Sequence, residues 1–154
     1  MTKALVLYHS QEYGNTRVMA EAVAEGLKAG GCEVDMFNTN EGRFNINKFP
    51  TYNCVAIGSP DYYSYIAGGL KTFIDDHYVA DVRNGLKNLT DKPFVLFCTH
   101  GGGGKVKEVM PRLFSRIGTQ VGETISCMGK PDANIQKKCR DLGKKLAEEA
   151  KKKK

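Results

Sequence analysis

The sequence lacks the features that direct a chain into a membrane or out of the cell. No apolar run approaches the roughly 20 residues of a bilayer-spanning helix, and the first residues do not form a signal-peptide pattern. Of the 154 residues, 41% are hydrophobic and 26% are charged, as in an ordinary globular protein. We therefore expect one cytoplasmic domain over residues 1–150, a basic C-terminal tail at 151–154, and no membrane partner.

Cysteine pairs with metal-ligand spacing are also lacking. The five cysteines, at positions 32, 54, 98, 127 and 139, are odd in number and widely separated, with no Cys-x-x-Cys and no clustered histidine. We therefore expect no metal site. All but the last lie in or beside an expected strand, where a thiol packs as a small hydrophobe.

The net charge of +6 is confined to one end of the chain. Residues 1–136 contain equal numbers of basic and acidic residues, so the whole excess lies in residues 137–154. A basic C-terminal helix that ends in four lysines is most simply a solvated surface with a frayed tail. We therefore expect no nucleic-acid partner.

Apolar and amphipathic segments alternate along the chain. Expected strands occupy residues 3–9, 32–37, 53–58, 93–98 and 119–127, and expected helices occupy 16–30, 65–79, 104–118 and 132–150. The last strand is weakened by Gly122, and residues 39–52 predict a loop or one short helix. Because the strands show little polar alternation, they indicate a parallel sheet buried on both faces. We predict a three-layer α/β fold whose five-stranded parallel sheet has the order 2-1-3-4-5.

In such a sheet, ligands bind at the carboxyl ends of the strands where the strand order reverses, here strands 1, 3 and 4. The turn after strand 1 contains Ser10, Gln11, Glu12, Tyr13, Gly14, Asn15 and Thr16. Its hydroxyls, its permissive glycine and the amides of a helix N-terminus suit a phosphate. No Lys or Arg lies between His9 and Thr16, so a phosphate here depends on amides and hydroxyls. An ordinary capped turn is the alternative.

An aromatic loop follows strand 3 and contains Ser59, Pro60, Asp61, Tyr62, Tyr63 and Tyr65. Three tyrosines within four residues suit stacking against a planar ring, although they would also cover the next helix.

A glycine-rich loop follows strand 4 and contains Thr99, His100, Gly101, Gly102, Gly103 and Gly104. Such a run lets backbone groups approach a ligand closely. It is not a Walker A loop, because Thr99 replaces the first glycine and Val106 replaces the final Ser or Thr. Together the three loops describe a site for a planar heterocycle with one phosphate, which FMN matches.

Three motifs resemble the flavodoxin family in its short-chain form, over essentially the full length of the chain. They are residues 6–10 with 13–16, residues 57–60, and strand 4 running into residues 99–102. The resemblance implies a flavodoxin-like fold and non-covalent FMN, with its phosphate on residues 10–16 and its isoalloxazine between residues 59–65 and 99–104. It also implies that the peptide between Asp61 and Tyr62 flips on reduction. All residues named in the three loops are predicted to bind the cofactor, and none to be catalytic.

Two departures from the family bear on function. The glycine-rich loop has only His100 where flavodoxins place an aromatic ring, and is similar to the loop of flavodoxin-like NAD(P)H:quinone oxidoreductases, whose usual insertions this chain lacks. Flavodoxins are also usually acidic, which steers them to basic partners, whereas residues 1–136 are neutral here. The carboxylates expected to make the flavin edge acidic are Asp61, Asp75, Asp76 and Asp81.

The leading hypothesis is a low-potential, FMN-dependent electron carrier between redox partner proteins, a reductase and an acceptor, working as a monomer or weak dimer. The alternative is a small NAD(P)H-dependent FMN reductase or quinone oxidoreductase. A receiver domain is disfavoured because His9, Ser10 and Ser59 occupy positions where it needs acidic residues. A phosphatase loop of the Cys-x5-Arg kind is missing, and a scaffold that kept the fold but lost FMN remains an alternative.

Overall fold

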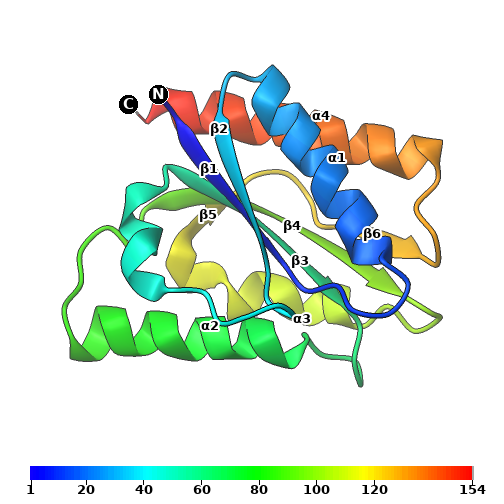
Figure 1. Cartoon of the computed structure of the whole chain (residues 1–154), viewed down its shortest axis with the longest axis horizontal. Coiled ribbons are helices and arrows are strands. Elements are labelled where there is room, and N and C mark those ends of the chain that lie inside the picture. The colour runs from blue at the N-terminus through cyan, green and yellow to red at the C-terminus, as the bar shows by residue number, and fades with distance from the viewer. Residues whose placement is uncertain (154) are drawn as a thin grey trace.

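A parallel sheet divides the protein into two helical layers (Figure 1). The computed structural model describes residues 1–153. The strands are β1 (Lys3–Tyr8), β2 (Glu33–Asn38), β3 (Cys54–Pro60), β4 (Lys92–His100), β5 (Gly118–Gln120) and β6 (Ile125–Met128). They pair in the order β2-β1-β3-β4-β5, all parallel, with β6 also paired to β4. The predicted fold class and strand order are confirmed.

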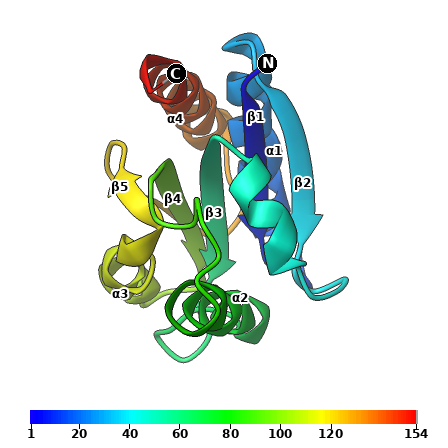
Figure 2. The same cartoon turned by 90° about the vertical axis from the view of Figure 1, so that its left-hand side faces the viewer.

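The helices are α1 (Asn15–Ala29), α2 (Gly68–Tyr78), α3 (Val106–Leu113) and α4 (Ala133–Lys152). The 3-10 turn η1 (Ile46–Thr51) supplies the short helix expected within residues 39–52. A π-helical turn, η2 (Val79–Arg83), extends α2, and the 3-10 turn η3 (Ser115–Ile117) follows α3. Seen from the end of the molecule in Figure 2, α1 and α4 cover one face of the sheet, and α2 and α3 cover the other.

Alternate side chains of each strand enter two separate cores. In β1, Ala4 and Val6 pack on the α1 and α4 side, whereas Leu5 and Leu7 pack on the α2 and α3 side. β3 and β4 follow the same alternation and are buried over nearly their whole length. Apolar residues on both faces of a strand explain why the sequence shows apolar runs rather than polar alternation.

The predicted fifth strand, residues 119–127, is wrong because it is two strands. β5 pairs with β4 from Lys92 to Phe94, and β6 pairs with it from Phe97 to His100. Between these two pairings the chain contains four residues, 121–124, where β4 has only two, Val95 and Leu96. Gly122 takes a left-handed φ of 67°. Such a backbone does not continue an extended strand, so the chain leaves the sheet and returns.

Three helix predictions are corrected at their ends. The helix expected at 104–118 spans only Val106–Leu113, with Pro111 inside it, and is followed by the 3-10 turn η3. The helix expected at 65–79 begins only at Gly68, after a tight turn that ends at Tyr65. α4 continues through Lys152, so part of the expected basic tail is helical, and residue 154 lies outside the described residues.

All five cysteines are buried, which confirms the prediction for Cys32, Cys54, Cys98 and Cys127 and extends it to Cys139 on α4. Burial raises the pKa of the Cys54 thiol and of the Cys139 thiol to about 12. These groups therefore stay protonated at neutral pH and pack as hydrophobes. Within residues 1–153, no helix is both long enough and apolar enough to cross a bilayer.

Close backbone contact joins α1 to α4. A Cβ atom on Gly143 would lie 2.2 Å from the carbonyl oxygen of Val23, and one on Gly26 would lie 2.0 Å from that of Arg140. Only glycine leaves room for helices this close.

His77 makes the stability of the fold depend on pH. Its Nε2 donates to the carbonyl oxygen of Leu89 at 2.6 Å, and the ring contacts both Phe49 and Phe73. Burial lowers the pKa of His77 from its ordinary value of 6.5. The unfolded chain therefore takes up a proton that the folded protein resists, and stability is lost as pH falls through 6.5.

Chemical unfolding at a series of pH values tests this effect. The control is His77→Gln, which keeps a donor for Leu89 but cannot titrate. Relative to this variant, the free energy of unfolding of the wild-type protein is expected to fall as the pH drops from 6.5 toward the lowered pKa of the folded state. The expected loss is up to about 1.4 kcal/mol per pH unit in that range. Parallel stability curves for the two proteins would contradict the assignment.

Candidate functional site

The three predicted loops meet in one cavity of about 260 Å³ at the carboxyl ends of β1, β3 and β4. The residues that line it are Ser10, Gln11, Glu12, Tyr13, Gly14, Asn15, Thr16, Pro60, Asp61, Tyr62, Thr99, His100, Gly101 and Gly129. All the predicted residues of the first loop therefore line the cavity, together with some residues of the other two loops. Gly129, which follows β6, was not predicted.

The first loop ends in an uncapped helix. Gly14 occupies the N-cap of α1 with φ of 75°, and no side chain caps the first turn. The amides of this turn point away from the helix at its positive end. The Thr16 hydroxyl is buried and lies 2.8 Å from that of Thr99, which joins the first loop to the glycine-rich loop. These features suit an anion above the first turn.

Asn38, at the end of β2, fixes the backbone of the first loop. Its Oδ1 accepts from the Ser10 amide at 3.0 Å, and its Nδ2 donates to the Ser10 carbonyl at 2.9 Å. Sequence reasoning missed this residue, because nothing within β2 shows which loop its last side chain meets. The one feature that could have indicated this role is a polar Asn at the end of the strand that pairs with β1.

A strained turn shapes the aromatic loop. Tyr62 and Tyr65 exchange backbone hydrogen bonds at 3.0 and 3.1 Å, and the two residues between them, Tyr63 and Ser64, take φ of 57° and 63°. Residues with side chains rarely adopt this conformation, so the turn stores strain at the rim of the cavity. Burial, and then the charge of Glu12, raises the pKa of the Tyr62 phenol, which therefore stays protonated.

Of the four carboxylates expected to make the flavin edge acidic, only Asp61 lines the cavity. Asp61 accepts from the Ser64 amide at 2.7 Å and from the Val106 amide at 3.1 Å, which ties the aromatic loop to the start of α3. The other three lie outside the cavity lining and form ion pairs with basic side chains. These pairs are Lys71–Asp75, Arg43–Asp76 and Arg116–Asp81.

The side chain of His100 lies next to Gly104 of the glycine-rich loop. Its Nδ1 is buried and has no hydrogen-bond partner within residues 1–153. A Cβ on Gly104 would lie 3.0 Å from its Nε2, so this glycine lets the loop close over the ring. A Cβ on Gly101 would instead meet no atom within 4 Å. The glycine run thus borders open space on its outer side.

Several predicted residues lie near the cavity without lining it. Ser59 is fully buried, and its hydroxyl donates to the Pro60 carbonyl at 2.7 Å and accepts from the Ala67 amide at 3.1 Å, so it holds the loop in place. The residues that lie outside the lining are Ser59, Tyr63, Tyr65, Gly102, Gly103 and Gly104. Their direct contact with a cofactor stays a prediction.

His9 contacts side chains from three segments beside the cavity, although it was not among the predicted binding residues. Its Nδ1 lies 2.9 Å from the Thr39 hydroxyl, and its Nε2 lies 2.7 Å from Oε1 of Gln11. Its ring also meets Tyr62 edge-on, with centroids 6.2 Å apart. The buried imidazole therefore positions side chains from two of the loops.

Replacement of His9 by alanine is expected to weaken binding of a ligand in the cavity about tenfold, because Gln11 loses a hydrogen bond worth about 1 kcal/mol and Tyr62 loses its ring contact. Titration with FMN, followed by quenching of its fluorescence, measures the change. His77→Gln provides a control at a buried histidine far from the cavity. Unchanged affinity in the alanine variant would contradict a positioning role for His9.

Comparison with known proteins identifies relatives of the chain. Residues 5–138 match the family described as Flavodoxin domain. The NAD(P)H dehydrogenase (quinone) of Cupriavidus metallidurans is 27% identical over 149 residues, which cover 85% of this chain and 72% of the relative. The enzyme of the same name from Azorhizobium caulinodans is 29% identical over 121 residues, covering 67% of this chain and 60% of the relative. The chain thus spans less than two thirds of the second relative.

The fold has a close match among solved structures. A flavodoxin from the domain Archaea superposes with a TM-score of 0.83 and 24% identity, covering 97% of this chain and 99% of the archaeal one. At this level of identity the likeness establishes a shared fold.

Proposed function

The chain belongs to the flavodoxin domain family, and from this premise we propose that it binds FMN and carries single electrons between a reductase and an acceptor protein in the cytoplasm. The observation that carries the proposal is the convergence of the three loops on one cavity beside the uncapped start of α1. Such a cavity offers a phosphate site at one end and aromatic and backbone groups at the other.

The residues of the cavity fit this cofactor. The helix end at Gly14 lacks a capping side chain and would receive the phosphate. The unpartnered Nδ1 of His100 offers one polar group to a heterocycle edge, and the open space beside Gly101 leaves room for a ring. Bound FMN would supply one-electron and two-electron chemistry at its isoalloxazine ring.

The protein's own residues orient the cofactor and limit its access to water. Thr16 and Thr99 join the phosphate end to the ring end through their hydroxyl pair. Tyr62 is half-buried and neutral, so it presents a flat apolar surface at the aromatic loop. Asp61 is anchored by two amides and holds that loop against α3. Electron transfer needs no further acid or base from these residues.

Titration of the apoprotein with FMN and with riboflavin tests the proposal. FMN is expected to bind with one-to-one stoichiometry, and riboflavin, which lacks the phosphate, on the order of a hundredfold more weakly. Equal binding of the two would exclude the first loop as a phosphate site. Absence of any FMN binding would refute the proposed function as a whole.

A second candidate is an NAD(P)H-dependent quinone reductase. The exposed glycine run at residues 101–103 favours it, because the run leaves one side of the cavity uncovered, and the two curated relatives carry this activity in their names. Mixing the FMN-loaded protein with NADPH under anaerobic conditions separates the candidates. Rapid bleaching by NADPH alone supports the reductase, whereas bleaching only after addition of a partner reductase supports the carrier.

A further inference from the structure

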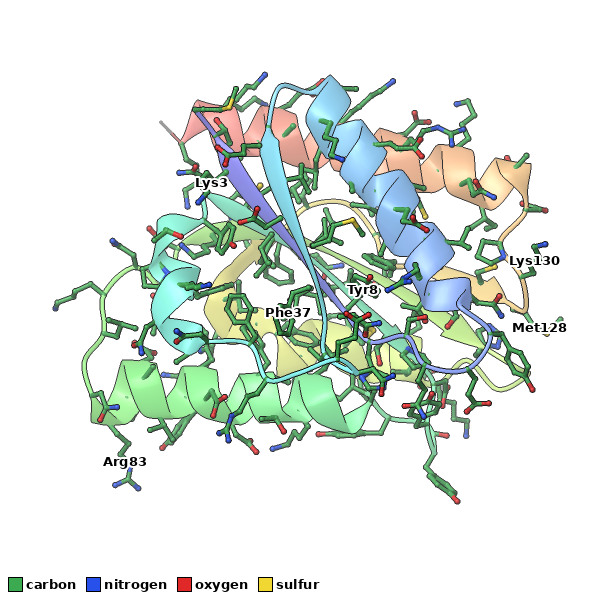
Figure 3. All side chains as sticks on the ribbon, viewed as in Figure 1. Lys3, Tyr8, Phe37, Arg83, Met128 and Lys130 are labelled. Carbon is green, nitrogen blue, oxygen red and sulfur yellow. The ribbon has the colours of Figure 1, made fainter. Side chains whose placement is uncertain are left out.

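A second polar cavity, also of about 260 Å³, lies at the amino ends of the strands. The residues that line it are Pro50, Tyr52, Asn53, Asn88, Asp91, Lys92, Ala150 and Lys153. Lys92 begins the nine-residue strand β4 and His100 ends it, so this strand separates the second cavity from the cavity formed by the three loops by roughly 25 Å. Figure 3 shows Lys3, which binds Asn53, at the end of the molecule opposite Met128. The second cavity is therefore separate from the proposed cofactor site.

Lys92 places a buried positive charge beside this cavity. It is only 3% exposed, and its Nζ donates to the Tyr52 carbonyl oxygen at 2.7 Å. An ammonium group has three N–H donors, and within residues 1–153 this oxygen is its one hydrogen-bond acceptor. The Phe49 ring, with its centre 5.2 Å from Nζ, attracts the charge without accepting a conventional hydrogen bond. Two donors of a buried cation therefore have no acceptor in the described part of the chain.

The neighbouring carboxylate does not compensate for this burial. Oδ1 of Asp91 lies 3.9 Å from Nζ of Lys92, which is beyond hydrogen-bond distance, and the Asp91 side chain is 64% exposed. Burial lowers the pKa of the Lys92 ammonium from its ordinary value of 10.5, although the charge of Asp91 acts in the opposite direction. The loss of water around the cation thus outweighs the attraction of the carboxylate. A negatively charged group in the cavity would stabilise the charged form of Lys92.

Two further lining residues add to the positive side of the cavity. Lys153 is exposed, and its Nζ donates to the backbone carbonyl of Asp91 rather than to a carboxylate. Oδ1 of Asn53 accepts from the Lys3 amide at 2.8 Å, so Nδ2 is the end of this side chain that remains a donor, and it has no acceptor within residues 1–153. The lining thus carries two lysines against one carboxylate, a net charge of +1.

The other charges at this edge act on the Tyr52 ring rather than on Lys92. Asp35 accepts from the Tyr52 hydroxyl at 2.6 Å, and Glu33 also raises the pKa of this phenol. Lys3 places its Nζ 5.3 Å from the centre of the same ring. None of these three residues lines the cavity, and none is among the charges that shift the pKa of Lys92. The excess positive charge of the lining therefore remains.

We propose that the second cavity, here called the amino-edge cavity, binds a phosphate group, either as free phosphate or at the end of a small organic molecule. The two lysines and the Asn53 amide are separate donors around one space, which suits a tetrahedral anion with an oxygen on each side. A planar carboxylate is better matched by the paired donors of arginine, and no arginine is among the described residues of the lining.

The surroundings of the amino-edge cavity also leave space for an organic part. An adjoining groove of about 790 Å³ shares Pro50 and Asn88 with it, so a phosphate ester could extend from one into the other. The inference does not depend on the proposed function, because the amino-edge cavity and the cavity formed by the three loops share no described lining residue.

Titration of the 15N-labelled apoprotein with inorganic phosphate tests the proposal, with the ionic strength held constant by sodium chloride. Saturable amide shifts are expected at residues 52–53 and 88–92, in addition to any at residues 10–16. Shifts confined to residues 10–16, or no saturable shifts at all, would overturn the amino-edge site. Failure of FMN to bind in a separate titration would refute the proposed function without changing the shifts at residues 52–53 and 88–92.

Two variants of the lining lysines show whether their charges hold the anion. Lys92→Met keeps an unbranched side chain without the charge, and is expected to weaken phosphate binding at least about tenfold, because a charge-assisted hydrogen bond is lost. Lys153→Gln is expected to weaken it about fourfold, because its charge is exposed to solvent. The second variant changes only an exposed side chain, so the test remains readable if Lys92→Met does not fold. Unchanged phosphate affinity in Lys153→Gln would overturn the proposal.

A matched control removes the same charge elsewhere on α4. Lys138 is exposed, does not line the amino-edge cavity, and makes no ion pair or side-chain hydrogen bond within residues 1–153. Lys138→Gln is expected to leave the phosphate affinity unchanged. Equal losses in Lys138→Gln and Lys153→Gln would show that only the net charge of the protein matters, and would overturn the proposal.

Phenyl phosphate and acetate, titrated in the same way, identify the anion. Tighter binding of phenyl phosphate than of inorganic phosphate would support an organic phosphate as the ligand, and equal or weaker binding would support free phosphate. Acetate is expected to produce no saturable shift at residues 88–92. If acetate bound there as tightly as phosphate, the cavity would not select a tetrahedral anion, and the proposal would be overturned.

Discussion

Ser10→Asp is expected to weaken FMN binding by at least about a hundredfold. The amide and the carbonyl of Ser10 are both held by Asn38, so the new carboxylate would have to remain beside the proposed phosphate site. Two negative charges roughly 5 Å apart, at an effective dielectric constant of about 20, repel each other by ~3 kcal/mol. No Lys or Arg within the loop is available to offset this charge, since the nearest, Arg17, is engaged by Tyr8 and Glu41.

Fluorescence titration of FMN with Ser10→Asp and with Ser10→Asn measures the effect. The asparagine variant has nearly the same shape without the charge, and is expected to lose less than about tenfold in affinity. Thermal unfolding of both apoproteins shows whether the loop substitutions disturb the fold. Similar losses in the two variants would mean that the phosphate does not lie beside residue 10.

Gly143→Ala is expected to cost about 2 kcal/mol or more of stability. The added methyl group would lie 2.2 Å from the Val23 carbonyl oxygen and 3.0 Å from the Leu27 amide nitrogen, both of them backbone atoms of α1. Neither atom moves by a rotamer change, so α1 and α4 must separate and part of the core beneath them must loosen. The gain of about 1 kcal/mol in helix propensity offsets only part of this cost.

Urea unfolding of Gly143→Ala and Gly68→Ala provides the comparison. Gly68 also lies in a helix, but a Cβ there would meet no atom within 4 Å. Gly68→Ala is therefore expected to leave stability unchanged or raise it by up to about 1 kcal/mol. If both variants were as stable as the wild type, the close contact between α1 and α4 would not be a constraint on this fold.

The strand order and the place of the cavity could be predicted because both depend on local patterns. Apolar runs separated by amphipathic helices specify a parallel sheet, and in such a sheet loops after strands 1, 3 and 4 meet at one edge. The first loop lines the cavity throughout, as predicted, because it is a short connection between a buried strand and a helix. The hydrophobic pattern and the direction of the chain together place this loop at the carboxyl edge of the sheet.

Residues that reach the site only through the pairing of strands were not predicted. Asn38, Thr39 and Gly129 belong to segments with no motif of their own, and they reach the site because β2 and β6 lie beside β1 and β4. The break between β5 and β6 was foreshadowed by Gly122, but its position depends on the pairing with β4. A polar side chain at a strand end takes its role from whichever strand is adjacent.

The distribution of charge shows most clearly what the sequence determines and what only the tertiary structure determines. The sequence by itself determined that residues 1–136 are neutral overall, that the sheet is parallel, and that a turn with hydroxyl side chains and a glycine follows its first strand. Only the tertiary structure decided that Asp75, Asp76 and Asp81 form ion pairs outside the cavity lining, whereas Glu12 and Asp61 lie in it. The reason is physical: burial follows local hydrophobic pattern, whereas the field at a site depends on which charges the fold brings together and which it neutralises.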